Sequence, residues 1–496
     1  MNLLSLKSGT DIRGVASEGE KDQPITLTNE VVKSIASGFL VFCEKRLNKS
    51  ADTMKIALGH DSRISAERIS HCIKDTFTKY GVEVLDCGLA STPSMFMAVI
   101  DVPCDCSVQI TASHHPYNRN GLKFFTKDGG LDSPDISEIL ENAQQKKTPN
   151  TETAGKVISS DFMKRYAEIL RNKIKESVSA EDYDLPLKNF KIVVDAGNGA
   201  GGFYAYDVLA PLGADVSGSV FLEPDGMFPN HVPNPENSDA MKAVSDATVH
   251  TGADIGVIFD TDVDRGAAVD QNGIEISRNK LVALSAAIAL ENEPGGVIVT
   301  DSVTSDGLKE YIENTLGGVH HRFKRGYKNV INEAVRLNKE GANCPLAIET
   351  SGHAAMRENY FLDDGAYLVT KIIIKMALLK KEGKNLEDLL RPLKEAVEAK
   401  EIRYSISDPD FHTYGENVLQ KLEAYAISKN WDIAPDNREG LRISFPESDG
   451  NGWFLLRLSV HDPIMPLNLE SNSIGGTELL LSHVTTFFKN HHFFDE

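Results

Sequence analysis

The sequence contains no long hydrophobic run and little positive charge, and each absence excludes a class of protein. No apolar stretch in its 496 residues reaches the roughly 18 that a membrane-spanning helix needs. Only 52 lysines and arginines stand against 72 aspartates and glutamates, so the formal net charge is −20. Such a chain lacks the basic surface that nucleic acid or an anionic membrane requires. If the substrate is an anion, we expect positive charge to be gathered locally in a cleft.

Cysteine is also scarce, and its spacing does not suit a zinc site. Of the six cysteines, Cys104 and Cys106 are separated by a single residue, and no second pair accompanies them. The N-terminal segment has neither the basic start nor the small-residue cleavage site of a signal peptide. We therefore expect a cytoplasmic protein with reduced cysteines.

Strand-like and helix-like segments alternate along most of the chain. We expect strands at 53–57, 82–85 and 106–111, a helix at 65–79 and a polar linker at 144–155. The same order recurs twice more, with strands at 190–195, 254–259, 297–301 and 346–349 and helices at 162–174, 306–314 and 364–381. This alternation is typical of an α/β fold with largely parallel sheets.

The last segment, from about residue 399, has a different pattern. Strands are expected there at 403–406, 441–444 and 453–459, and helices at 411–428 and 477–489. We therefore predict an α/β protein whose three similar domains have mixed, largely parallel sheets, followed by a smaller C-terminal α+β domain. The predicted domain boundaries are 1–155, 156–285, 286–395 and 396–496.

Three aspartates follow the apolar strand 255–259 at alternate positions: Asp260, Asp262 and Asp264. In an extended segment, residues two apart face the same side. Two carboxylates about 4 Å apart repel by roughly 4 kcal/mol at an effective dielectric near 20, so three need a cation or a proton. Oxygen ligands of this kind suit Mg²⁺. An EF-hand is excluded because Arg265 and Gln271 stand where it needs glycine and glutamate. A solvated acidic turn is the alternative.

A second candidate is Ser113, which follows a strand in the loop Thr111–Pro116 and stands beside His114. A serine hydroxyl is a weak nucleophile unless a neighbouring base or a metal activates it, and both are candidates here. The alternative is a turn serine that bonds its own backbone.

The segment Gly197–Gly202 matches the pattern G-x-G-x-x-G between a strand and a helix, and Glu223 lies about 20 residues further on. This pattern favours a dinucleotide site. A tight turn also selects glycine for steric reasons alone, so both interpretations remain.

Two further polar loops follow strands later in the chain. The loop Glu349–His353 combines a carboxylate, a hydroxyl and an imidazole, which suit a polyol such as a sugar; the alternative is a helix-capping turn. Arg457, Ser459 and His461 end a strand in the last domain, and an arginine fork with two further donors can hold a phosphate. The alternative there is a solvated arginine.

Taken in this order, the loops resemble those of the α-D-phosphohexomutase superfamily, the phosphoglucomutase/phosphomannomutase group, over essentially the whole chain. Thr10–Gly14 resembles the family's opening D-I-R-G, whose arginine, Arg13 here, lines the active site. Thr111–Pro116 resembles its T-A-S-H-N-P loop, which implies a phosphoryl-carrying serine at Ser113. Lys123 matches the family's active-site lysine.

The other loops are similar to the family's D-G-D-x-D-R metal loop, its G-E-M-S-G-H sugar loop, its R-P-S-G-T-E-P phosphate loop and, at 324–328, its third-domain specificity loop. The resemblance implies catalytic roles for Ser113, His114, Lys123, Arg13 and Arg265, and metal ligation by Asp260, Asp262, Asp264 and Ser113. It implies substrate binding by Glu349, Ser351, His353, Tyr327, Arg325, Arg457, Ser459 and His461. For the segment 324–328, a basic helix start is the alternative.

The chain also departs from the family pattern. His115 replaces asparagine, Thr261 and Ile348 replace glycines, Thr350 replaces methionine, and Val460 and His461 replace glycine and threonine. Losing a glycine stiffens the phosphate loop and narrows its approach to phosphate.

The resemblance implies four domains around a central cleft and a mutase that interconverts hexose 1-phosphate and hexose 6-phosphate, of glucose, mannose or both. It further implies a phosphoserine, a hexose 1,6-bisphosphate intermediate, Mg²⁺ and a monomer or dimer with no nucleic-acid or membrane partner. His114, Lys123 and His353 are all candidates for the general base.

Three other functions are weighed against this one. The first is hexose-1,6-bisphosphate synthesis from another bisphosphate donor, which needs the same serine and metal. The second is a nicotinamide-dependent oxidoreductase built on the glycine turn. The third is a non-catalytic protein that binds sugar phosphates.

Overall fold

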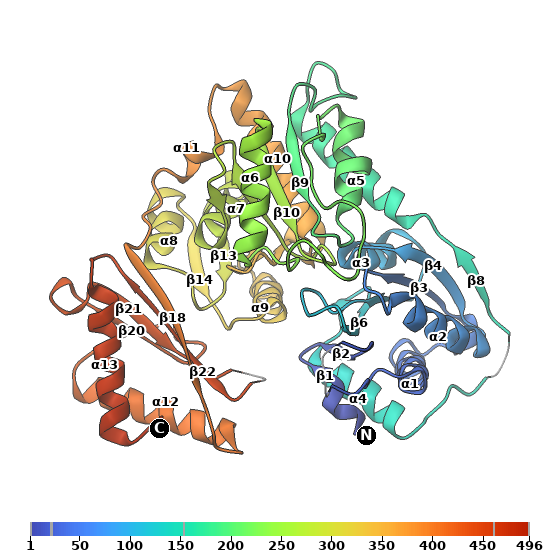
Figure 1. Cartoon of the computed structure of the whole chain (residues 1–496), viewed down its shortest axis with the longest axis horizontal. Coiled ribbons are helices and arrows are strands. Elements are labelled where there is room, and N and C mark those ends of the chain that lie inside the picture. The colour runs from blue at the N-terminus through green and yellow to red at the C-terminus, as the bar shows by residue number, and fades with distance from the viewer. Residues whose placement is uncertain (1, 20–22, 152–153, 460–461, 495–496) are drawn as a thin grey trace. The chain divides into compact units, whose positions relative to one another are not determined.

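A computed structural model describes residues 2–19, 23–151, 154–459 and 462–494 (Figure 1). The chain divides into two compact units, one of Met1–Leu281 with Ser351–Glu387 and the other of Val282–Thr350 with Asp388–Glu496. In the described part of the chain, no helix is long and apolar enough to cross a membrane.

The first unit opens with a mixed sheet in the order β1-β2-β6-β5-β3-β4-β8, with β7 paired to β6. Its strands are β1 Lys7–Ser8, β2 Asp11–Val15, β3 Lys55–His60, β4 Glu83–Leu89, β5 Cys106–Ile110, β6 Arg119–Thr126, β7 Gly129–Gly130 and β8 Lys156–Ser159. β5, β3, β4 and β8 are parallel, whereas β1, β2, β6 and β7 pair antiparallel. The three strands predicted in this region are confirmed as β3, β4 and β5, each within a few residues.

Helices cover both faces of this sheet (Figure 1). They are α1 Asn29–Leu47, α2 Ala66–Lys79, α3 Thr92–Asp101 and α4 Ser133–Gln144. Helix α2 buries Ile69, Ile73 and Phe77, which recur every four residues and so form one apolar stripe. These side chains join α1, α4 and the sheet in one core. After α4, the described part of the expected linker contains no helix or strand.

The second sheet of this unit has the order β12-β11-β10-β9. Its elements are α5 Phe162–Val178, β9 Ile192–Asp195, α6 Ser238–Thr251, β10 Ile255–Phe259, β11 Gly266–Asp270 and β12 Glu275–Ile276. Only β9 and β10 are parallel; the other pairs are antiparallel. Every residue of β10 is buried, so the chain leaves this strand directly into the aspartate segment at an interior position.

The segment after residue 350 joins the first unit through buried hydrogen bonds. It contains β16 Ala354–Met356, β17 Leu362–Asp363 and α10 Gly365–Lys381. Tyr166 of α5 donates to Asp364 at 2.6 Å, and Tyr204 lies 2.8 Å from the hydroxyl of Thr370. These bonds hold α10 and its first turn to α5 and to the helical segment that follows β9.

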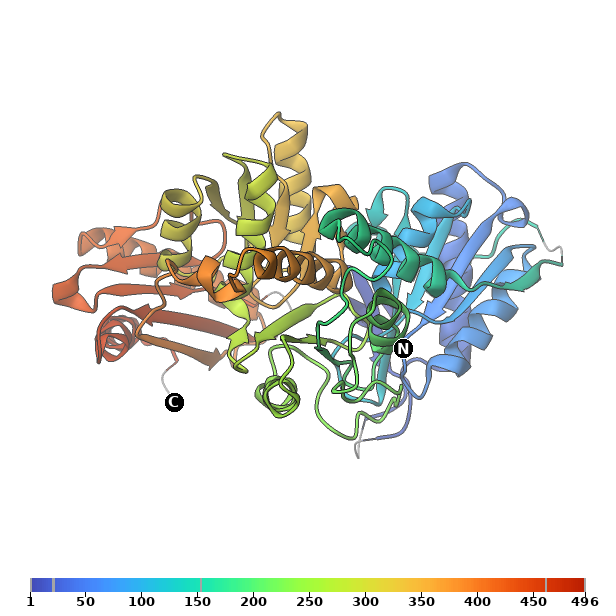
Figure 2. The same cartoon turned by 90° about the horizontal axis from the view of Figure 1, so that it is seen from above.

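The second unit contains three parallel strands of one mixed sheet and a separate antiparallel sheet. In the first, β13 Val297–Thr300 lies between β14 Val319–Arg322 and β15 Leu346–Ile348, and the helices are α7 Arg278–Asn292, α8 Asp306–Glu310 and α9 Tyr327–Lys339. After α11 Leu386–Leu390 follow β18 Glu398–Ser405, α12 Phe411–Ser428, β19 Asp432–Ile433, β20 Leu441–Phe445, β21 Gly452–Leu456, β22 Ile464–Ser471 and α13 Gly476–His491. This last sheet is wholly antiparallel, in the order β18-β22-β21-β20-β19, and is drawn in red in Figure 2. The predicted fold class, three α/β parts followed by an α+β domain, is confirmed.

Candidate active site

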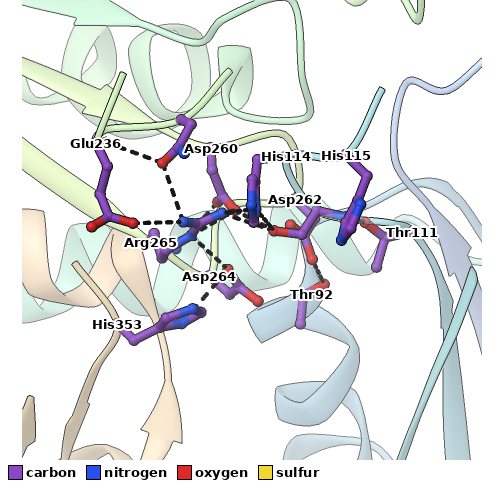
Figure 3. Close-up of polar contacts among 12 residues, drawn as sticks. Thr92, Thr111, His114, His115, Glu236, Asp260, Asp262, Asp264, Arg265 and His353 are labelled. Atoms are coloured by element: carbon purple, nitrogen blue, oxygen red, sulfur yellow. Dashed lines mark hydrogen bonds and ion pairs between the residues drawn. The ribbon is translucent and has the colours of Figure 1, made fainter. Parts of the chain in front are cut away.

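Ser113 lies just past the end of β5, where the first sheet approaches the second. Its backbone is left-handed at φ 50°, a strained conformation for a residue with a side chain. Ser113 is also buried, with only 3% of its surface exposed. Its hydroxyl donates to Oδ2 of Asp260 at 3.0 Å and accepts from Nη2 of Arg265 at 3.0 Å. The close-up in Figure 3 shows this neighbourhood. A hydroxyl from the first sheet therefore meets a carboxylate from the second.

Arg63, which the sequence analysis missed, holds the serine loop in place through hydrogen bonds. Its buried guanidinium donates to main-chain oxygens of the loop: those of Ser113, His115 at 2.6 Å, Pro116 at 2.7 Å and Arg119 at 2.9 Å. Asp61 lies 3.4 Å from its Nε and supplies the opposite charge. One signal was available, because Asp61 and Arg63 follow β3, a parallel neighbour of β5, and so lie at the same sheet edge as Ser113.

Replacing Arg63 by alanine is expected to destabilise the protein strongly. The change leaves one buried and three partly buried carbonyl groups without this donor and Asp61 without its counter-charge, so the free energy of unfolding should fall by about 3–5 kcal/mol. Arg63→Lys keeps the charge but not the planar fork, and we expect an intermediate loss. Urea denaturation measures both. Arg46→Ala, on the surface of α1, is the matched control, with an expected change within about 0.5 kcal/mol. A loss below about 1 kcal/mol for Arg63→Ala would contradict this role.

The three aspartates form a buried cluster: Asp260, Asp262 and Asp264 are each 0% exposed, and their ligand oxygens lie within 4.8 Å of one another. The prediction that these aspartates lie on an extended segment is wrong. The chain turns after β10, with Val263 at φ 67°, and the turn brings the carboxylates together. Burial also excludes the solvated acidic turn that was the alternative.

The cluster fits a metal ion. Oδ1 of Asp262 and Oδ1 of Asp264 are buried and have no hydrogen-bond partner among the described residues. The other oxygen of Asp262 accepts from Thr92 at 2.5 Å, and the other oxygen of Asp264 accepts from Lys123. Buried polar atoms are rarely left unpaired, and two anionic oxygens without donors suit a hard cation with oxygen ligands.

Neighbouring charges shift the pKa values of Asp260 and Asp264 in opposite directions. Burial, together with the charges of Asp264 and Asp262, raises the pKa of Asp260 well above its ordinary value. Burial alone would raise the pKa of Asp264 too, but Lys123, His353 and Arg265 lower it below its ordinary value. A bound cation would oppose this rise in the pKa of Asp260, because metal ligands must be deprotonated.

Arg265 connects the aspartates to the serine loop. Its Nε donates to Asp260 at 3.2 Å, and its Nη2 donates to Nδ1 of His114. Burial and the charge of Arg265 hold the pKa of His114 far below its ordinary value, so the imidazole is neutral, with Nδ1 as acceptor 3.2 Å from the hydroxyl of Ser113. Asn234 accepts from Arg265 at 3.1 Å, a contact for which the sequence offered no signal.

His353 approaches the cluster from the segment after β15. Its Nδ1 lies 2.7 Å from Asp363, a partner the sequence analysis missed, and 3.8 Å from Asp264. Burial would lower the pKa of His353, but Asp363 and Asp264 raise it to about 9. Ser351 is buried nearby in the chain, and its hydroxyl has no hydrogen-bond partner within the described ranges.

Two basic residues of the first unit also lie near the serine loop and the aspartates. Lys123 of β6 lies 3.4 Å from Asp262 and also contacts Asp264. Arg13 of β2 stands opposite Gly121 in the sheet, and its charge helps lower the pKa of His114. The positive charge expected for this acidic chain is therefore gathered beside the serine loop.

The remaining predicted residues belong to the second unit. Glu349 accepts from the main chain of Gly326 at 2.5 Å, and Tyr327 begins α9, so the segment 324–328 is a helix start. Arg457 follows β21, and the hydroxyl of Ser459 accepts from the main chain of Asp462 at 3.3 Å. Val460 and His461 lie outside the described residues.

The glycine turn packs against the aspartate loop. A β-carbon at Gly199 would lie 2.5 Å from the carbonyl oxygen of Thr261, and the next main-chain N–H, of Ala200, donates to that oxygen at 2.8 Å. This close approach of two backbones accounts for the glycine without a dinucleotide.

Comparison with known proteins gives one consistent result. Models described as phosphoglucomutase/phosphomannomutase, alpha/beta/alpha domains I, II and III, match residues 5–150, 164–273 and 277–396. A phosphomannomutase/phosphoglucomutase of Pseudomonas syringae pv. tomato is 29% identical over 421 residues, covering 84% of this chain and 83% of that protein. A phosphoglucomutase of Neisseria meningitidis serogroup A is 28% identical over 471 residues, covering 94% and 93%. A solved structure of a phosphoglucomutase/phosphomannomutase family protein from Burkholderia thailandensis has a TM-score of 0.81 at 26% identity, covering 99% and 98%.

Proposed function

Because the chain belongs to the phosphoglucomutase/phosphomannomutase family of hexose phosphate mutases, we propose that it interconverts hexose 1-phosphate and hexose 6-phosphate by way of a phosphoserine at Ser113. Glucose and mannose phosphates are the proposed substrates, in line with the names of the relatives. The observation that carries the proposal is the position of the Ser113 hydroxyl, 3.0 Å from both Asp260 and Arg265.

The residues around Ser113 suit phosphoryl transfer. Arg265 already donates to the serine oxygen and would hold the phosphoryl group that replaces its proton, while Lys123 adds a second positive charge. Neutral His114 keeps an imidazole beside the hydroxyl without adding charge. Mg²⁺ held by Asp260, Asp262 and Asp264, with Ser113 as a further ligand, would neutralise charge on the transferring group.

The proposed cycle has two transfers. Ser113 first gives its phosphoryl group to a bound hexose monophosphate, which forms a hexose 1,6-bisphosphate. The bisphosphate then turns around and returns its other phosphoryl group to Ser113. The attacking sugar hydroxyl needs a base, and His114, Lys123 and His353 are the proposed candidates. Of the two histidines, His114 is neutral, whereas His353, with a pKa of about 9, must first lose its proton.

We assign the sugar and the non-reacting phosphate to residues of the second unit, together with Ser351 and His353. The residues assigned to them are Arg325, Tyr327, Glu349, Arg457, Ser459 and His461. The four-domain division, the cytoplasmic location and the monomeric or dimeric state stay predictions.

A coupled assay tests the proposed function. We expect turnover of glucose 1-phosphate, mannose 1-phosphate or both, with Mg²⁺ and only catalytic amounts of the matching hexose 1,6-bisphosphate, because the bisphosphate is regenerated in each cycle. Consumption of a bisphosphate donor in equal amount to product would instead identify the synthase. Absence of any hexose phosphate conversion would favour the non-catalytic alternative.

A further inference from the structure

In the second unit, Glu439 contacts both the specificity segment 324–328 and Arg457, the residue to which the proposed function assigns phosphate binding. Its Oε2 accepts hydrogen bonds from the hydroxyl of Ser302 at 2.6 Å and from the main-chain N–H of Arg325 at 3.0 Å. Its Oε1 lies 3.8 Å from Nη1 of Arg457, and the two side chains are each 12% exposed. One half-buried carboxylate therefore connects the two segments to which substrate recognition is assigned.

The backbone holds Glu439 firmly in this place. Leu441 of β20 is paired with Leu456 of β21, so Gly440 stands beside Arg457. Gly440 has φ 62°, and a β-carbon there would lie 2.2 Å from the oxygen of Leu456 and 2.8 Å from Cα of Arg457. Only glycine permits this contact between the two strands. Because Glu439 directly precedes Gly440, the contact holds the backbone of Glu439 close to Arg457.

The charges in this cluster are close but loosely paired. The 3.8 Å between Glu439 and Arg457 exceeds the 2.7–2.9 Å of a charge-assisted hydrogen bond. Nε of Arg457 is buried with no hydrogen-bond partner in the described part of the chain. Burial lowers the pKa of Arg457, Glu439 opposes that effect, and the like charge of Arg325 adds to it. A bound phosphate could accept hydrogen bonds from Arg457 at distances shorter than the one to Glu439.

We infer that Glu439 is a positioning residue with two effects: its hydrogen bonds hold the specificity segment, and its charge weakens the hold of Arg457 on phosphate. The inference rests on the proposed function, in which Arg457 binds the phosphate that does not react. A mutase must release its bisphosphate from that site and bind it again reversed. Tight ground-state binding would slow this step, so a moderating carboxylate favours turnover.

Two substitutions separate the two effects. Glu439→Gln keeps an oxygen acceptor for Ser302 and Arg325 but removes the charge, so we expect Kd for glucose 1-phosphate and for inorganic phosphate to fall roughly three- to tenfold. KM and kcat should both fall in this variant. Glu439→Ala removes the hydrogen bonds as well, which frees the specificity segment, and we expect Kd for glucose 1-phosphate to rise about tenfold above that of the unmodified protein.

Calorimetry on the full-length protein and steady-state kinetics measure these changes, with thermal unfolding as a check of the fold. Glu416→Gln, on the exposed face of α12, changes the net charge equally and should alter neither constant. Opposite shifts of Kd in the two variants support the inference. A residue that only holds the loop would leave Glu439→Gln unchanged, and a residue that only contributes charge would shift both variants downward; either result overturns it while the proposed function stands. Failure of the unmodified protein to bind either glucose 1-phosphate or mannose 1-phosphate would overturn both.

Discussion

Replacing Ser113 by alanine is expected to lower mutase turnover by at least about 10³-fold, because in the proposed cycle its hydroxyl carries the phosphoryl group between the two transfers. The hydroxyl of Ser113 is the only part lost, and Thr111 still accepts the main-chain N–H of residue 113 at 2.9 Å. The loop should therefore keep its conformation, and binding of hexose phosphate should change little.

Intact-mass measurement after incubation with hexose 1,6-bisphosphate and Mg²⁺ gives an independent readout. The unmodified protein should gain the mass of one phosphoryl group, and Ser113→Ala should gain none. Ser34→Ala, on α1 where the hydroxyl bonds only the carbonyl of Glu30, is the matched control and should behave as the unmodified protein. Substantial turnover by Ser113→Ala would remove the phosphoserine from the proposed mechanism.

Replacing Asp262 by asparagine is expected to separate activity from stability. Metal affinity should fall at least 10- to 100-fold, and turnover at limiting Mg²⁺ should fall with it, because a neutral amide is a poorer ligand than a carboxylate. In the metal-free protein, by contrast, the same substitution should be favourable for stability. The three carboxylates repel one another in a buried cluster, so removing one charge should raise the free energy of unfolding by about 1–2 kcal/mol.

Thermal unfolding in a chelator and in excess Mg²⁺ measures both effects. The unmodified protein should gain stability on adding Mg²⁺, since a ligand that binds only the folded state stabilises it, whereas Asp262→Asn should gain little. Asp128→Asn, at an exposed position near Arg46, removes the same charge and should keep the full response. If Asp262→Asn were less stable than the unmodified protein without metal, the cluster would be structural rather than a cation site.

The order of strands and helices could be predicted from the sequence alone. Apolar periodicity, glycine turns and polar linkers are local, so the strands at 53–57, 82–85 and 106–111 were found within a few residues. The α+β pattern of the last domain was also found, but its strand β22 Ile464–Ser471 was missed. The motifs carrying Ser113 and the three aspartates were also visible, because each occupies one short loop after a strand. The spacing of the aspartates sufficed to suggest a metal site, whereas the role of Ser113 also needed the resemblance to the family.

The tertiary structure alone decided which loops meet. Ser113 and Asp260 are 147 positions apart, and their contact depends on how two sheets pack, which no local pattern encodes. The same holds for Arg63, whose hydrogen bonds go to backbone oxygens that any sequence would offer. The turn at Val263 brings the aspartates together where strand alternation was expected. Local preferences thus determine the elements, whereas the site is assembled by long-range packing.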